Sequence, residues 1–90
     1  MELKKHVNEI IDIAEANDVA WDVGMEMFLA NARNCGDETL PHYPGAYVDW
    51  SALKLELEPM TDAQVAEMKN DFAYWYRAHA DEIRMARKGA

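Results

Sequence analysis

The sequence has few of the residues that stabilise small secreted domains. Its single cysteine, Cys35, cannot form an intramolecular disulfide, and the opening segment MELKKHVNEI contains no apolar stretch typical of a secretory signal. No apolar run approaches the roughly 20 residues that span a bilayer. The acidic helices also lack the Lys and Arg of an interfacial helix. We therefore expect a cytoplasmic protein that binds no membrane.

Basic residues are also scarce. The chain has 17 acids and 9 bases, which gives a net charge of −8. The region between His6 and Met68 contains thirteen of the acids and only two of the bases, Arg33 and Lys54. A field of this sign repels phosphates and attracts basic surfaces. The charge therefore argues against direct nucleic-acid binding, and it is interpreted either as a solubilising surface or as an acidic binding face.

Motifs for catalysis, metal binding or phosphate binding are missing. The three histidines and the cysteine show no H-x-x-x-H, E-x-x-H or C-x-x-C spacing, and the four glycines form no phosphate-binding loop. No motif surrounds the candidate nucleophiles Cys35 and Ser51, and we expect His79 to be a half-buried histidine at the edge of the core. The sequence thus predicts a non-enzymatic protein with no cofactor or metal, and a small metal protein or enzyme is the minor alternative.

The length of 90 residues and the half-apolar composition predict a single α-helical domain over residues 1–90. Apolar residues recur at helical spacing from Leu3 to about Asn34, as one long helix or as two helices meeting near Asn17. We favour two, with Asp18 as the N-cap of the second. Residues 37–48, with two prolines and a glycine, are expected to form the main loop.

The second half of the chain contains a short and a long predicted helix. The segment 50–58 fits a strand or a helix, and we predict a helix because its residues are strong helix formers and Asp49 is a suitable N-cap. Thr61 and Gln64 form a capping box that begins a helix of over 20 residues. At roughly 40 Å, this helix is long enough to project or to pack on a partner. The fold class is therefore an all-α bundle of three or four helices with a Pro/Tyr-rich connecting loop and a long C-terminal helix.

Five acids are spaced by three or four residues, with no base between them. On one helix, or on two helices in line, they would form a continuous acidic stripe that imitates a row of phosphates, although the exposed back of an amphipathic helix would look the same. We predict that the stripe binds a partner, with Asp37 and Glu38 at its margin. Tyr74 is predicted to be an exposed anchor, with Met25, Met60 and Met85 as adaptable apolar neighbours. The acidic stripe consists of Asp12, Glu15, Asp18, Asp22 and Glu26.

A few letters are similar to the nuclease-colicin immunity proteins, which are small acidic four-helix inhibitors. The opening MELK and the segment His42, Tyr43 and Pro44 carry the similarity, but the family has a paired tyrosine where this chain has His42 and Tyr43. This short match assigns no family. Phage anti-CRISPR proteins are similar only as a class of small, often acidic proteins.

The sequence predicts a small acidic protein-binding inhibitor. Its partner would be a protein with a basic surface, for example a nucleic-acid-binding complex antagonised by a phage protein of the anti-CRISPR type. The alternative is a structural or regulatory homo-oligomer, such as a homodimer, in which the long C-terminal helix pairs with its symmetry mate. The residues predicted for that pairing are Phe72, Trp75, Tyr76 and His79.

Overall fold

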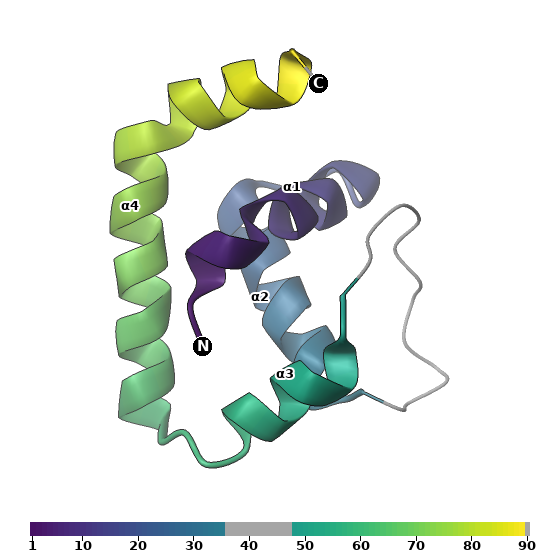
Figure 1. Ribbon diagram of the computed structural model, residues 1–90, viewed down its shortest axis with the longest axis vertical. Helices are drawn as coiled ribbons and strands as arrows, with labels where there is room; N and C mark the ends of the chain where they lie inside the picture. The colour runs from purple at the N-terminus through teal and green to yellow at the C-terminus, as the bar shows by residue number, and fades with distance from the viewer. Residues whose placement is uncertain (36–47, 90) are drawn as a thin grey trace.

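The computed structural model describes residues 1–35 and 48–89, and in these ranges the protein is all-α (Figure 1). This result confirms the predicted fold class. A short 3-10 helix, η1, leads into the first α-helix, and three further α-helices follow. The elements are η1 (Leu3–His6), α1 (Val7–Ala16), α2 (Trp21–Arg33), α3 (Trp50–Leu57) and α4 (Asp62–Lys88). The predicted loop at residues 37–48 lies almost entirely outside the described residues.

The first apolar segment forms two helices, α1 and α2, joined by a tight turn. Val19 donates its backbone N–H to the Ala14 carbonyl at 3.0 Å, and the side chain of Asn17 donates to the Ile13 carbonyl at 2.8 Å. Asp18 has a φ of 53°, in the left-handed region that Asp and Asn tolerate better than most residues. The predicted cap was wrong, because α2 begins after Ala20 as its N-cap and Asp18 closes the turn instead.

Helices α1 and α2 approach each other most closely at Gly24. A Cβ atom built on Gly24 would lie 2.6 Å from the Cβ of Ala14 and 2.9 Å from the carbonyl oxygen of Ile10. Glycine is therefore required by the distance between the two helices. This close crossing places α2 across α1 and not in line with it.

Helix α3 confirms the prediction for residues 50–58. The carboxylate of Asp49 accepts a hydrogen bond from the backbone N–H of Ala52 at 3.1 Å, which caps the first turn. Leu53 and Leu57 are buried one turn apart, whereas Leu55 is 69% exposed. The alternating leucines, which also fitted a strand, therefore lie on an amphipathic helix in which one leucine is exposed.

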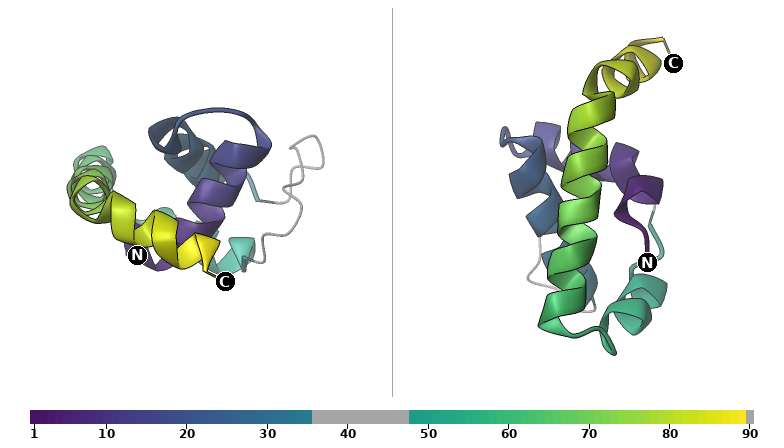
Figure 2. Two further views of the ribbon diagram at one scale, coloured as in Figure 1. Left: turned by 90° about the horizontal axis from the view of Figure 1, so that it is seen from above. Right: turned by 90° about the vertical axis from the view of Figure 1, so that its left-hand side faces the viewer.

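Helix α4 begins at the predicted capping box. The Gln64 side chain accepts from the Thr61 N–H at 2.8 Å, and the Thr61 hydroxyl accepts from the Gln64 N–H at 3.1 Å. A straight helix of 27 residues would be roughly 40 Å long, but the longest dimension of the protein is 34 Å. Figures 1 and 2 show that α4 bends, so that its last turns pass over the N-terminal part of the molecule. The end of α4 does not project from the domain.

The core lies where α1, α2 and α3 meet the inner side of α4. Phe28 is completely buried, and its ring lies 5.1 Å from that of Trp50 and 5.3 Å from that of His6. Trp21 connects α2 to α4, because its ring stacks on Tyr76 at 4.5 Å and lies 6.0 Å from Phe72. Aromatic side chains thus link α2 to α4 on one side and to α3 and η1 on the other.

Candidate protein-binding surface

The five carboxylates of the acidic stripe do not form one line. Asp12 and Glu15 lie on α1, Asp18 lies in the turn, and Asp22 and Glu26 lie on α2. Helix α2 packs across α1 at Gly24, so the regular spacing in the sequence does not continue in space. The predicted continuous stripe was therefore wrong, because it required one helix or two helices in line.

Two of these carboxylates hold the end of α4 against α1. The guanidinium of Arg87 lies 2.5 Å from Asp12 and 3.6 Å from Glu15, and it also donates to the backbone carbonyl of Asn8 at 3.3 Å. The Arg87 side chain is only 23% exposed, so this contact is partly shielded from solvent. Asp12 and Glu15 thus have a structural role that local spacing could not predict.

A third carboxylate of the stripe pairs with the middle of α4. Glu26 accepts from the ammonium of Lys69 at 2.8 Å. Close by, the guanidinium carbon of Arg77 lies 5.5 Å from the centre of the Trp21 ring, within the range of a cation–π contact. Bases of α4 therefore neutralise or cover the side of α2 that faces them.

Asp18 and Asp22 remain available for binding. Both side chains are exposed, and neither forms a salt bridge within the described residues. Asp22 also lines a pocket between α2 and α4 together with Asn70 and Ala73 of α4. Asp18 and Asp22 are thus the two acids of the stripe that have no ion pair within the described residues. The predicted marginal residues Asp37 and Glu38 lie outside the described part of the chain.

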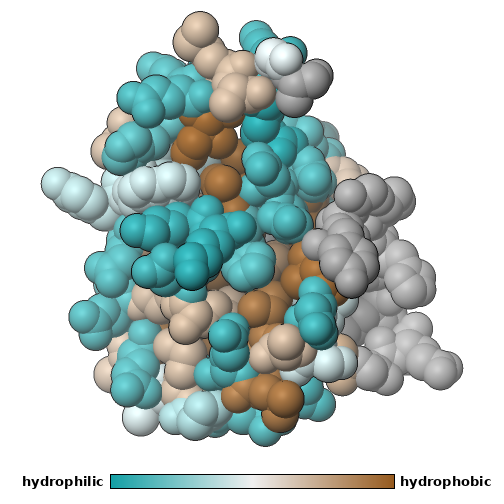
Figure 3. All heavy atoms as spheres, in the orientation of Figure 1, coloured by the Kyte–Doolittle hydropathy of each residue, from teal (hydrophilic) through white to brown (hydrophobic). Residues whose placement is uncertain are grey.

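The outer side of α4 presents the predicted anchor Tyr74, which is 81% exposed. Of the methionines predicted as its apolar neighbours, Met85 is exposed and Met60 is half-buried. Met25 does not belong to such a surface, since it is buried in the core at 6% exposure. Figure 3 shows that hydrophilic residues cover most of the face it presents, with hydrophobic residues reaching the surface between them.

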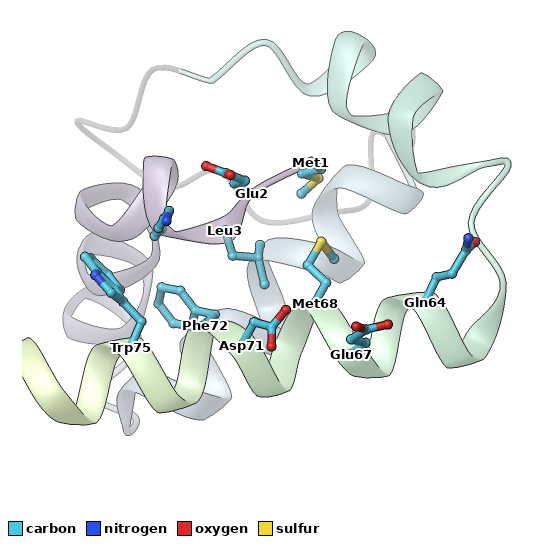
Figure 4. Close-up of a pocket in the computed structure, with 10 residues that line it drawn as sticks. Met1, Glu2, Leu3, Gln64, Glu67, Met68, Asp71, Phe72 and Trp75 are labelled. Carbon is cyan, nitrogen blue, oxygen red and sulfur yellow. The ribbon is translucent and has the colours of Figure 1, made fainter.

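A groove between the N-terminal segment and α4 was not predicted from the sequence. It has a volume of about 300 Å³, and Figure 4 shows Glu2 on one side and Glu67 and Asp71 of α4 on the other. The i, i+4 spacing of Glu67 and Asp71 places both residues on one face of the predicted helix, so this wall of the groove could have been recognised from the sequence. The opposite wall comes from a residue more than sixty positions away, so no local pattern indicates it. The groove is lined by Met1, Glu2, Leu3, Lys4, Gln64, Glu67, Met68, Asp71, Phe72 and Trp75.

The candidate nucleophiles and His79 contact neighbouring groups of the same chain. The Sγ of Cys35 lies 3.6 Å from the Ser51 hydroxyl, and His79 is half-buried with its Nδ1 2.9 Å from the Trp75 carbonyl oxygen. Within residues 1–35 and 48–89, no three His, Cys, Asp or Glu side chains gather in a group that could hold a metal. None of the helices in these ranges has the length and apolar character needed to cross a membrane.

Comparison with protein-family models, curated proteins and solved structures finds no match to this chain. The fold and surface therefore define it as a small acidic all-α protein.

Proposed function

We propose that the chain is a non-enzymatic inhibitor that binds a partner protein through its acidic helical surface. The partner would carry a basic surface that otherwise holds nucleic acid, as in the target of an anti-CRISPR-type antagonist. Carboxylates presented there replace the phosphates, and release of counterions favours binding as it does for nucleic acid.

The observation that carries this proposal is that many of the basic side chains contact groups of the same chain. Arg87 and Lys69 pair with acids of α1 and α2, and Arg84 pairs with Asp81 at 3.3 Å. Arg77 covers the Trp21 ring. Lys54 donates to the Cys35 carbonyl at 3.5 Å. Five of the nine bases thus contact groups of the same chain, while many carboxylates on the described surface have no salt bridge. The excess negative charge is consequently turned toward solvent.

The proposed contact surface combines the α1–α2 turn with the outer side of α4. Asp18 and Asp22 supply charge at the turn, and Asp22 borders a pocket whose opposite wall includes Asn70 and Ala73. The same wall carries Lys69 and Arg77, which contact Glu26 and the Trp21 ring. Tyr74 follows Ala73 directly on α4 and adds an amphipathic ring, a side chain that is frequent at the centre of protein interfaces.

The homo-oligomer alternative has less support, because most of the residues predicted for it pack within the same chain. Phe72 is 3% exposed, and Trp75 and Tyr76 are half-buried against the core of the same chain. Pairing through Phe72 and Tyr76 would require α4 to leave Trp21. No observation within the described residues favours this alternative over the inhibitor.

Capture experiments in a cell lysate test the proposal. The tagged chain should retain a nucleic-acid-binding protein that is released as salt rises and that added DNA or RNA displaces. The variant Asp18→Asn with Asp22→Asn should capture several-fold less, because it removes two unpaired charges while asparagine tolerates the backbone at residue 18.

A control variant, Glu56→Gln with Glu58→Gln, removes the same number of charges from exposed positions at the other end of the molecule, in and next to α3. It should capture as much as the unmodified chain. If both variants captured equally less partner protein, binding would depend on net charge alone. Capture that does not change with salt or with added nucleic acid would contradict the proposed function.

A further inference from the structure

We propose that the groove between the N-terminal segment and α4 receives a lysine or arginine side chain of the partner protein. This inference rests on the proposed function and names the chemical group that the acidic surface would recognise.

The floor of the groove is apolar and consists of side chains that belong to the core. Leu3, Met68 and Phe72 are buried core residues, and each also lines the groove. Trp75 is half-buried and forms one end of it, next to Phe72, with 6.0 Å between the two ring centres (Figure 4). Because these side chains belong to the hydrophobic core, the groove is formed before a ligand arrives.

The rim of the groove is predominantly negative. Glu67 and Asp71 lie one turn apart on α4, and Glu2 lies across from them. None of the three forms a salt bridge within the described residues. Lys4 and the amino group of Met1 are the positive groups among the residues that line the groove, so the three carboxylates outnumber them. Like charges at i, i+4 repel each other. A cation placed between them would relieve this repulsion.

An apolar floor below a negative rim matches the two parts of a long basic side chain. Lysine and arginine bury their methylene stems along apolar surface and keep the charged group at its edge. The Trp75 ring offers an additional face for the cation. A bare inorganic cation would leave the floor uncovered, and a volume of about 300 Å³ is at the small end for ligand pockets, so it suits one side chain.

The position of the groove also favours a protein as the source of this side chain. Asp71 on the rim and Tyr74 on the outer side of α4 are three residues apart, which places them on adjacent turns of the same helix. The Tyr74 side chain is largely exposed to solvent. A protein that inserts a basic side chain into the groove would therefore cover Tyr74 at the same time, which a free small cation would not do.

The inference is tested with defined probes on the full chain by amide and methyl NMR. N-acetyl-lysine methylamide and N-acetyl-arginine methylamide are titrated, with the norleucine analogue as a probe that keeps the stem and lacks the charge. The basic probes should shift the Trp75 indole and the Leu3 and Met68 methyl signals in a saturable way. Equal binding of the norleucine analogue, or shifts scattered over all acidic residues, would overturn the inference.

A charge variant gives the second arm of the test. Glu67→Gln with Asp71→Asn should raise the Kd of the lysine probe about fivefold, because it removes two exposed charge contacts. The control Glu56→Gln with Glu58→Gln should leave it unchanged. An unchanged Kd in the first variant would overturn the inference.

Different results would refute the proposed ligand of the groove and the proposed function of the protein. If the groove is wrong, the basic probes do not bind there although capture in the lysate still depends on Asp18 and Asp22. If the proposed function is wrong, the lysine probe still binds to the groove while no nucleic-acid-binding protein is captured.

Discussion

The close crossing of α1 and α2 at Gly24 makes a quantitative prediction about stability. In Gly24→Ala the new Cβ would lie 2.6 Å from the Ala14 Cβ and 2.9 Å from the Ile10 carbonyl oxygen. One neighbour is a short side chain and the other is backbone, so neither can rotate away. The helices must therefore separate, and the contact between α1 and α2 must loosen along its length.

The magnitude follows from two opposing effects. Overpacking of a rigid core site costs typically 1–3 kcal/mol, and a contact with backbone belongs at the upper end of this range. Replacing a helical glycine by alanine returns about 1 kcal/mol. We therefore expect Gly24→Ala to lower the free energy of unfolding by about 2 kcal/mol. In a domain of this size that corresponds to a decrease in Tm of roughly 8–16 °C.

Thermal and urea unfolding followed by circular dichroism would measure this change, and the chain has a matched control. A Cβ built on Gly89 would lie 3.5 Å from the Met85 carbonyl oxygen, which is an ordinary contact. Gly89→Ala should therefore leave the Tm unchanged or slightly raised. If Gly24→Ala were as stable as the parent protein, the helix crossing described here would be refuted.

Two further predictions concern the attachment of α4. Trp21→Ala removes the ring that stacks on Tyr76, and we expect it to lower the free energy of unfolding by about 3 kcal/mol or more, measured by urea unfolding; a loss below about 1 kcal/mol would contradict the role of Trp21 as the bridge to α4. Arg87→Met keeps an unbranched stem but removes the contacts to Asp12, so the last turns of α4 should exchange their amide hydrogens faster, with a global loss of about 1–2 kcal/mol. Unchanged exchange in that segment would show that the ion pair does not hold the end of the helix.

Local patterns in the sequence predicted most of the helices. The capping box at Thr61 and the N-cap at Asp49 were recognised because each involves hydrogen bonds between residues three positions apart. The start of α2 was placed wrongly for a related reason. Asp18 is a good capping residue, but it also tolerates a positive φ, and the tight turn between the two helices uses that second property.

The candidate binding surface was only partly predictable. Tyr74 could be placed on the outer side of its helix by spacing alone, and the structure confirms its exposure. Met25 could not be distinguished from an exposed methionine, because burial depends on which helix packs against it. The groove was missed because its two walls come from opposite ends of the chain.

The sequence by itself determined the helical class, most of the helix boundaries and the excess of negative charge, because these depend on composition and on contacts within one helical turn. The tertiary structure alone decided which carboxylates remain available to a partner. Arg87 reaches Asp12 across 75 positions of the chain, and Lys69 reaches Glu26 across 43. Such pairs exist only after the core has brought α4 against α1 and α2, since the packing of buried side chains sets the distances between charges on different helices.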